Sequence, residues 1–415
     1  MLARLKKEGL DFLEAIRKGN DTFFFLLLCL FITSNVVVLI NWRRDLFSYA
    51  WKAHFLMFAA VMWGSAIYLF SIILEWRDAW KRTGEIIAIG AAVFIVTGIV
   101  SKTVTTDSYA FVMGAYFCLM ACGKKYKKIF YCFLFIIVAA LLIGWIGLRI
   151  HITLDAVKPR RAYGGHSLGI LYPNDWGYFV FNVMLIIWYM FLRQKKIITL
   201  VFFWGISVFM YKYITCLTIA GMAFLFPVVG IIAELIQSKL QEREKKHFKA
   251  MKTIVIALPF IFLGLMLLGC WRMDWIHTTF YDTPLESMAM RFVEGGYSLM
   301  NNGVTLFGQP FRQWNQSLVD YSQEIEMIVD SALICYLIIR GIIPMIMTLG
   351  WLSFAHNRCL RKKDYRLLAI STFMLLFSMM ERPGLDAWYN FVLLYPLASL
   401  NDQENSIPVI SEATQ

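Results

Sequence analysis

The feature that most constrains this chain is a succession of apolar stretches, many of them as long as a lipid bilayer is thick. A helix needs about 20 apolar residues to cross a hydrocarbon core of about 30 Å. Hydrophobic residues make up 59% of the 415-residue chain, and charged residues only 16%. A soluble domain of this length does not sustain that ratio. We therefore predict an all-α, polytopic membrane bundle of about twelve transmembrane helices, forming one integral membrane domain over residues 1–415.

The boundaries of the predicted spans are loose because several stretches are short, and one or two of them could be re-entrant. No internal repeat is evident, which disfavours the transporter folds that are built from repeated halves. The predicted spans are roughly Thr22–Leu39, His54–Glu75, Ile86–Val104, Ser108–Cys122, Ile129–Ile150, Trp176–Leu192, Ile197–Tyr211, Thr215–Leu235, Thr253–Trp271, Ile328–Leu349, Leu367–Met380 and Trp388–Leu400.

Basic residues are unevenly distributed between alternate loops. With a cytoplasmic N-terminus, 26 of the 40 Lys and Arg residues fall on the inner side and 13 on the outer side, while Arg340 lies inside a span. Cytoplasmic loops carry the excess of Lys and Arg in membrane proteins, so both termini are predicted to be cytoplasmic. This explains the net charge of +12 as a topology signal. No nucleic-acid-binding motif accompanies the charge, and no nucleic-acid partner is expected.

This orientation leaves two polar segments on the outer side, at about 151–175 and 272–327. The second is the longest loop, and loops of such length without disorder-like composition are usually functional. It contains Thr283-Pro284-Leu285-Glu286, a capping box with Pro at the first helical position. The sequence therefore predicts a short helix in this loop, weakened by Gly295-Gly296 and ended by Asn301-Asn302-Gly303.

The first outer segment contains a cluster of polar side chains in the sequence KPRRAYGGHSLGILYPNDWG. Arg160 and Arg161 are suited to a pyrophosphate because a guanidinium presents forked donors to phosphate oxygens. The alternative is an interfacial anchor to lipid headgroups. His166 is a candidate general base or a hydrogen-bonding partner for a sugar, or else a structural residue. Asn174 is a further candidate for substrate binding.

Four more charged candidates lie in or after the second outer segment. Arg291 falls on the predicted loop helix, where a surface ion pair with Glu294 is the simpler interpretation, and Arg312 follows a turn-rich stretch. Asp330 opens the tenth span and is either an N-cap or a catalytic base facing a sugar hydroxyl. Arg340 lies about 15 Å further along that helix, where a charge is costly and faces protein or water, unless it snorkels to the interface.

Several classes of site have no signature in the sequence. We find no P-loop, Rossmann glycine fingerprint, HExxH or GxSxG motif, which disfavours a nucleotide-driven enzyme. None of the eight cysteines forms a CxxC pair, so neither a disulfide framework nor a zinc site is expected. We expect no cofactor and no metal. Any enzyme substrate is expected to be already activated and to lie in the membrane.

The order of these features is similar to that of a bacterial family, the Wzy-like polysaccharide polymerases of the O-antigen ligase and polymerase superfamily. His166-Ser167-Leu168-Gly169 through Pro173-Asn174 resembles the family's "SLGF-HPN" stretch. Arg291 through Leu306-Phe307-Gly308 resembles its "R…lfG" segment in the long loop. Val329-Asp330-Ser331 through Arg340-Gly341-Ile342 resembles its "vDn-yl…GI" helix. The resemblance covers roughly residues 60–400, and the order and spacing of the short motifs carry it.

The resemblance implies a function at the outer face of the bacterial plasma membrane. Members transfer a growing glycan chain from undecaprenyl diphosphate onto a lipid-linked repeat unit, without nucleotide sugar or metal. Arg291 is the best candidate to stabilise the departing pyrophosphate, with Arg160 and Arg161 next, and Asp330 or His166 would deprotonate the acceptor hydroxyl. The expected partners are lipid-linked oligosaccharides and membrane lipids, together with a flippase and a chain-length regulator of the same pathway.

The sequence departs from the family at two places. Many members carry an Arg near the start of the eighth span, whereas this chain has Ile214-Thr215-Cys216-Leu217-Thr218 with only Lys212 nearby. Ligases of the superfamily carry a His before the tenth span, and its absence from Ile325–Ser331 favours a polymerase. An O-antigen ligase, a flippase for lipid-linked sugars and a scaffold without chemistry remain the rival hypotheses.

Overall fold

The structure is a computed structural model whose described part is built from helices. The described residues are 19–75, 107–155, 166–192, 196–214, 216–240, 247–280, 283, 286–309 and 330–399. Within them, pairing between extended segments is limited to isolated bridges, which confirms the all-α prediction. The helices gather into two compact units. The first unit comprises residues 1–93, 112–224 and 387–415, and the second comprises residues 94–111 and 225–386.

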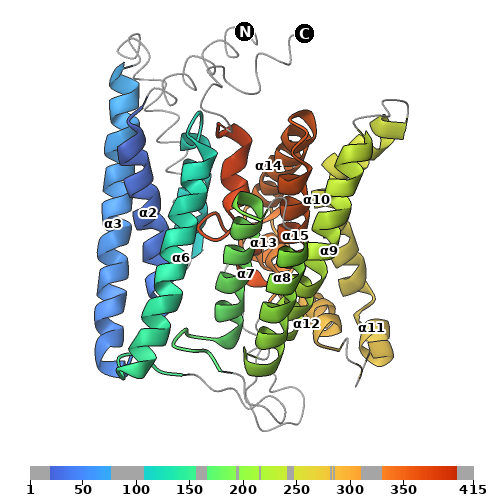
Figure 1. The fold of residues 1–415 in the computed structure, drawn as a ribbon, viewed down its shortest axis with the longest axis horizontal. Coiled ribbons are helices and arrows are strands. Elements are labelled where there is room, and N and C mark those ends of the chain that lie inside the picture. Colours follow the sequence, from blue (N-terminus) through green and yellow to red (C-terminus); the bar gives the residue numbers. More distant parts are fainter. Residues whose placement is uncertain are drawn as a thin grey trace. The chain divides into compact units, whose positions relative to one another are not determined.

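The first unit is a group of roughly aligned helices. In Figure 1, α2, α3 and α6 run side by side, and α2 packs against both of the others. α6 also packs against α7 and η3. The elements are α2 (Asp21–Val37), α3 (Arg44–Glu75), most of α5 (Asp107–Met120), α6 (Tyr126–Arg149), α7 (Pro173–Met190), α8 (Lys196–Phe209), the π-helical η1 (Met210–Ile214), the start of α9 (Leu217–Leu240) and the 3-10 helix η3 (Phe391–Leu397).

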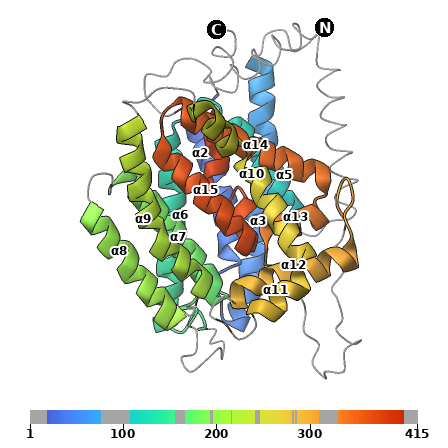
Figure 2. The same ribbon diagram turned by 90° about the vertical axis from the view of Figure 1, so that its right-hand side faces the viewer.

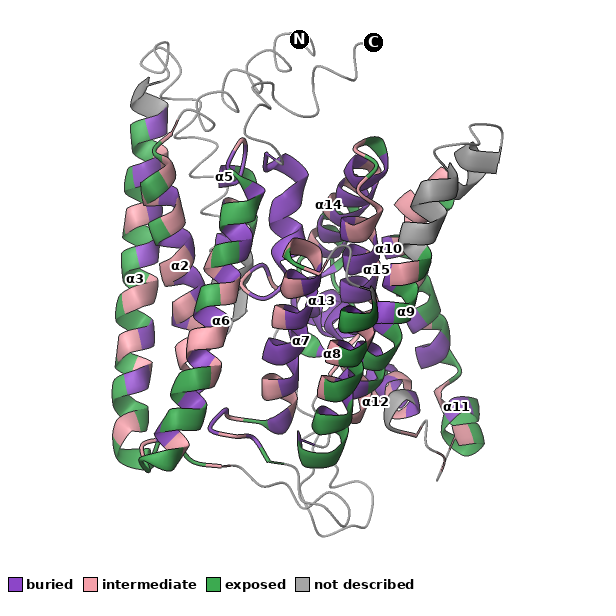
Figure 3. Ribbon diagram, viewed as in Figure 1, coloured by how far each residue is buried: buried purple, intermediate pink, exposed green. Residues whose placement is uncertain are grey.

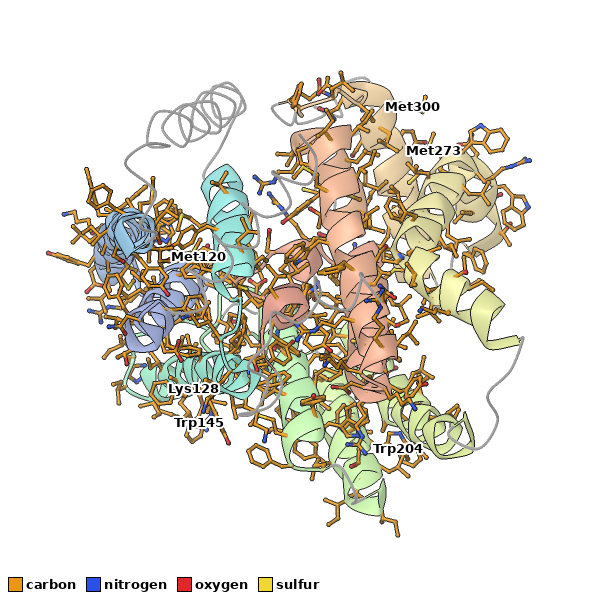
Figure 4. All side chains as sticks on the ribbon, turned by 90° about the horizontal axis from the view of Figure 1, so that it is seen from above. Met120, Lys128, Trp145, Trp204, Met273 and Met300 are labelled. Atoms are coloured by element: carbon orange, nitrogen blue, oxygen red, sulfur yellow. The ribbon has the colours of Figure 1, made fainter. Side chains whose placement is uncertain are left out.

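Large apolar side chains cover the outside of this unit. On α3, Leu56 and Trp63 are 73% and 74% exposed, and α3 and α6 carry long green stretches of exposed residues in Figure 3. Trp145 on α6 is half exposed and is labelled in the view from above (Figure 4). Such surfaces are stable only when something other than water covers them.

Within the part of the chain that the structure describes, four helices are long and apolar enough to cross a membrane. They are Arg44–Ile72, Tyr126–Arg149, Ile197–Ile214 and Lys252–Trp271. Together with the exposed apolar faces, they identify the chain as a membrane protein with several apolar helices.

The second unit is organised around α10 (His247–Trp271), which packs against α12, α14 and α15. α12 also packs against α11 and α13, as Figure 2 shows. The other elements of this unit are α11 (Met273–Phe280), α12 (Glu286–Asn302), α13 (Ala332–Ile339), α14 (Ile342–Arg361), α15 (Tyr365–Met380) and the 3-10 helix η2 (Arg382–Leu385).

The prediction of one continuous tenth span over Ile328–Leu349 is wrong. α13 ends at Ile339, and α14 begins two residues later at Ile342. Gly341 between them has a φ of +90°, a left-handed conformation that ends a helix and that glycine adopts without steric cost. The span is therefore divided into a short helix and a longer one.

The predicted twelfth span, Trp388–Leu400, is also wrong as a transmembrane α-helix. Residues Phe391–Leu397 form a 3-10 helix instead, with Asn390 as its N-cap and Pro396 inside it. All seven of these residues are buried. The apolar composition that predicted a span here reflects burial inside protein. The third predicted span, Ile86–Val104, lies outside the described residues.

Candidate functional site

The loop helix predicted in the second outer segment exists as α12. It begins at Glu286, ends at Asn302, and is followed by Gly303 with a φ of +69°, as its sequence signals indicated. Gly295 and Gly296 do not interrupt it. A Cβ on either glycine would meet atoms of Cys270 or Met273, so these positions let α12 approach α10 and α11 closely.

The start of α12 differs in detail from the predicted capping box. The hydroxyl of Thr283 donates to the carbonyl of Phe280 at 2.7 Å, and the amide of Glu286 donates to the carbonyl of Thr283 at 3.0 Å. The threonine thus stabilises the preceding turn through its hydroxyl and the first turn of α12 through its backbone.

Arg291 is the centre of a buried ionic cluster rather than one half of a surface pair. Its side chain is only 7% exposed, and its Nη1 contacts carboxylate oxygens of both Asp330 and Glu294, the latter at 3.4 Å. Its Nη2 lies 3.7 Å from Oε1 of Glu381. The cluster therefore joins α12, the residue before α13 and the end of α15.

The three carboxylates of this cluster differ in their access to solvent. Glu381 is 1% exposed, whereas the side chain of Asp330 is 30% exposed. Asp330 is not the N-cap of α13, because Ser331 occupies the cap position before Ala332. Its carboxylate is instead held by Arg291. Of the cluster's acids, Asp330 is the one that an outside molecule can reach most easily.

The two motif segments in the second unit meet at the break between α13 and α14. The amides of Ile342 and Ile343 donate to the carbonyls of Thr305 and Leu306 at 3.0 and 3.1 Å, and Gln309 donates to Ile338. A Cβ on Gly308 would overlap the carbonyl of Ile339. Residues 305–309 thus satisfy backbone groups that the broken helix exposes.

Arg340 closes α13 and is buried inside protein. Its guanidinium lies 5.2 Å from the ring centroid of Tyr336, and the side chain is 4% exposed. The snorkelling alternative does not describe this position. The hydroxyl of Tyr336 in turn donates to a carboxylate oxygen of Asp386. A cation at the C-terminal end of a helix is also favoured by the helix dipole.

In the first unit, His166 pairs with Asp155, an acid that the sequence did not single out. Nδ1 of His166 lies 2.6 Å from Oδ2 of Asp155. Oδ1 of Asp155 accepts hydrogen bonds from the backbone amides of Ser167 at 2.8 Å and Leu168 at 3.0 Å. Burial raises the pKa of Asp155, but the hydrogen bonds from His166 and the two amides outweigh it and lower the pKa below its usual value.

Small residues on α6 hold this segment in place. Gly169, with a φ of +85°, approaches Gly144 so closely that a Cβ would overlap the backbone of α6. Thr153 sits against Gly147 and donates from its hydroxyl to the carbonyl of Gly144 at 2.8 Å. In Figure 1 the segment leaves the lower end of α6 and returns to the lower end of α7. Its Ser-Leu-Gly stretch is thus a tightly packed turn.

The other predicted site residues are not brought into either cluster. Asn174 lies in the first turn of α7, directly after Pro173 at the first helical position, and is half-buried. Arg160, Arg161 and Arg312 lie outside the described residues.

Two residues of these clusters were missed by the sequence interpretation. Glu381 follows α15 and pairs with Arg291. Asp155 follows an irregular stretch after α6 and pairs with His166. The available signal was the same for both: a carboxylate next to an apolar span, in a chain with few charges.

Chemically, each cluster presents a reachable proton acceptor. In the second unit it is the carboxylate of Asp330, and in the first unit it is the imidazole of His166, which is 46% exposed. Among the described residues, no group of three or more His, Cys, Asp or Glu side chains is arranged to hold a metal ion.

In comparisons with known proteins, no family model, no curated protein and no solved structure matches this chain.

Proposed function

We propose that this protein is a bacterial polysaccharide polymerase, a glycosyltransferase that uses lipid-diphosphate-linked oligosaccharides. It would transfer a growing glycan chain from undecaprenyl diphosphate onto a lipid-linked repeat unit at the outer face of the plasma membrane. The proposal includes a polytopic membrane bundle with cytoplasmic termini, and partners that are a flippase and a chain-length regulator of the same pathway. It assigns no role to a metal or a nucleotide.

One observation carries the proposal. Two segments that resemble polymerase motifs, one around Arg291 and one beginning at Asp330, meet through a direct ion pair. A second contact joins the same segments where Gly308 lies against the backbone of Ile339. Segments that only share composition with the family would have no reason to converge at their motif residues.

The proposed reaction needs a base and a stabilised leaving group. The acceptor hydroxyl oxygen bonds to the anomeric carbon of the donor chain, and the bond from that carbon to the lipid diphosphate breaks, leaving its electron pair on the diphosphate. A base takes the hydroxyl proton, and Asp330 and His166 are the candidates. Arg160, Arg161, Arg312 and Arg340 are proposed as cations for the diphosphate.

Arg291 has a more constrained place in this scheme. Its guanidinium already contacts carboxylates of Glu294, Asp330 and Glu381. A diphosphate would have to displace one of them, and the weakest contact is the 3.7 Å pair with Glu381. We keep Arg291 as the leading pyrophosphate contact and add that it also fixes the carboxylate of Asp330.

The first experiment is the length distribution of surface and lipid-linked glycan in a strain that lacks the protein. Single repeat units at the outer face, without long chains, support the polymerase. Long chains left on the lipid carrier would instead identify a ligase, and units trapped at the inner leaflet would identify a flippase. An unchanged profile would refute all glycan hypotheses.

Complementation with point variants then connects the phenotype to the cluster. Asp330→Asn is expected to restore no long chains, because it removes the reachable acid of the ion pair. Asp274→Asn is the matched control, since Asp274 is an exposed acid in the first turn of α11. Equal amounts of the two variants in the membrane must be shown by immunoblot.

A further inference from the structure

The arrangement around His166 fixes the position of its proton. A carboxylate with a lowered pKa is ionised at neutral pH and can only accept hydrogen bonds. Because Oδ2 of Asp155 lies 2.6 Å from Nδ1 of His166, that nitrogen must carry the hydrogen. In the neutral imidazole the lone pair is then on Nε2. The side chain is 46% exposed, so this nitrogen belongs to a ring that solvent reaches.

Hydrogen bonds also fix the backbone at His166 and at the two residues after it. The amide of His166 donates to the carbonyl of Tyr213 at 3.0 Å, in the π-helical turn η1. Asp155 binds the next two amides, of Ser167 and Leu168. Leu168 has a φ of +48°, an uncommon conformation for a leucine. Single π-helical turns and strained backbone are both frequent at functional sites.

A purely structural role accounts for only part of this geometry. Oδ1 of Asp155 alone caps the turn by accepting from the two amides, and it also accepts from the hydroxyl of Ser167 at 3.3 Å. The imidazole adds little to that cap, yet the second carboxylate oxygen is directed at Nδ1. Holding Nδ1 with a carboxylate is how histidine bases are oriented.

We infer that Asp155 and His166 form the proton-accepting pair of the protein, with Nε2 of His166 as the base and Asp155 as its positioning residue. The inference rests on the proposed function for its substrate, a sugar hydroxyl of the lipid-linked acceptor. As that oxygen bonds to the anomeric carbon, its proton passes to Nε2, and the lipid diphosphate leaves with the electron pair of the broken bond. The proton then returns to water.

This assignment chooses between the two candidate bases. The Oδ2 of Asp330 is already occupied by the guanidinium of Arg291. His166 instead has Nδ1 held by an acid on a side chain that is 46% exposed. Histidine is also the side chain best matched to proton transfer near neutral pH.

The test is Asp155→Asn, a change that keeps the shape of the side chain. Its Oδ1 still accepts from the two amides, but the new amide group donates to Nδ1 and moves the imidazole proton to Nε2. Chain elongation on lipid-linked repeat units, measured in membranes, is expected to fall by about 10²-fold or more. His151→Asn is the matched control in the same segment and is expected to elongate normally.

A second readout reports the imidazole without relying on turnover. Diethyl pyrocarbonate acylates the unprotonated nitrogen, and peptide mass spectrometry follows each histidine separately. In Asp155→Asn the acylation of His166 is expected to slow by about tenfold, because Nε2 now carries the proton. Acylation of the exposed His277 serves as the internal standard and stays unchanged.

The outcomes separate the inference from the proposed function. Normal elongation in His166→Gln would overturn the inference, as would lost elongation in Asp155→Asn with unchanged acylation of His166, which is the signature of a structural role. If the wild-type protein elongates nothing but the acylation contrast holds, the proposed function fails while the activated pair stands.

Discussion

Replacing Arg291 with methionine tests whether the ionic cluster holds the second unit together. The substitution keeps an unbranched side chain but removes a guanidinium that contacts Glu294, Asp330 and Glu381. The pairs with Glu294 at 3.4 Å and Glu381 at 3.7 Å are each worth about 5 kcal/mol of Coulomb attraction at an effective dielectric constant of about 20. Desolvation offsets part of this, and loss of one partner from a buried pair costs about 3–5 kcal/mol.

Part of that cost should come from Glu381, whose side chain is 1% exposed and loses its contact with the guanidinium. At about 2 °C per kcal/mol, the melting temperature in detergent is expected to fall by about 6–10 °C. The double variant Arg291→Met with Glu381→Gln should recover about 1–3 kcal/mol, because the buried carboxylate that lost its contact with Arg291 is then replaced by a neutral amide.

The control for this experiment is Arg272→Met. Arg272 is exposed and lies over the ring of Trp271, with its guanidinium 4.7 Å from the ring centroid, so its removal should cost less than about 1 kcal/mol. A melting temperature of Arg291→Met within 2 °C of the wild type, or strictly additive effects of the two cluster substitutions, would refute the reasoning.

Three further predictions follow from other parts of the structure. Gly341→Ala is expected to lower the free energy of unfolding, measured by melting in detergent, by at least about 2 kcal/mol, because it places a Cβ in a left-handed conformation against the backbone of residues 305–309. The control Gly350→Ala, which has open space around it, should leave the free energy of unfolding unchanged or raise it. Hydrogen bonds outweigh burial and lower the pKa of Asp155 in the folded protein. The ionised carboxylate therefore stabilises its loop fully above about pH 4, and this stabilisation is lost as the pH falls through the lowered pKa. Limited proteolysis at stepwise lower pH is expected to show cleavage of the loop rising only below the lowered pKa. Asp21→Asn should lower the melting temperature by the equivalent of about 1–3 kcal/mol, since it removes the charged partner, at 2.7 Å, of the fully buried ammonium of Lys124; an unchanged melting curve would contradict this.

Signals in the local sequence were sufficient to predict structure that depends on residues adjacent in the chain. The limits of α12 follow from a turn signal before Glu286 and from Gly303 after Asn302. Apolar length likewise placed most helices. It failed for residues 388–400, because apolar length does not distinguish a lipid-facing span from a buried 3-10 segment such as Phe391–Leu397.

Features that depend on contacts distant in sequence could be predicted only in part. The break between α13 and α14 depends on residues 305–309, which make backbone hydrogen bonds with Ile338, Ile342 and Ile343. The family resemblance assigned Arg291 and Asp330 to the same reaction, but it did not predict their ion pair. Glu381 has no sequence neighbour that marks it as a partner of Arg291.

The break between α13 and α14 explains how charges are tolerated in an otherwise apolar stretch. All eight residues of α13 are buried, so this helix is surrounded by protein and not by lipid. Irregular backbone at membrane depth is stable under that condition, or where it lines water. The dipole of α13 stabilises the charges at both of its ends, because the carboxylate of Asp330 precedes the first turn and the guanidinium of Arg340 belongs to the C-cap residue. A continuous lipid-facing helix would have exposed Arg340 to hydrocarbon. It follows that a molecule that reaches Asp330 does so through the exposed side of its carboxylate.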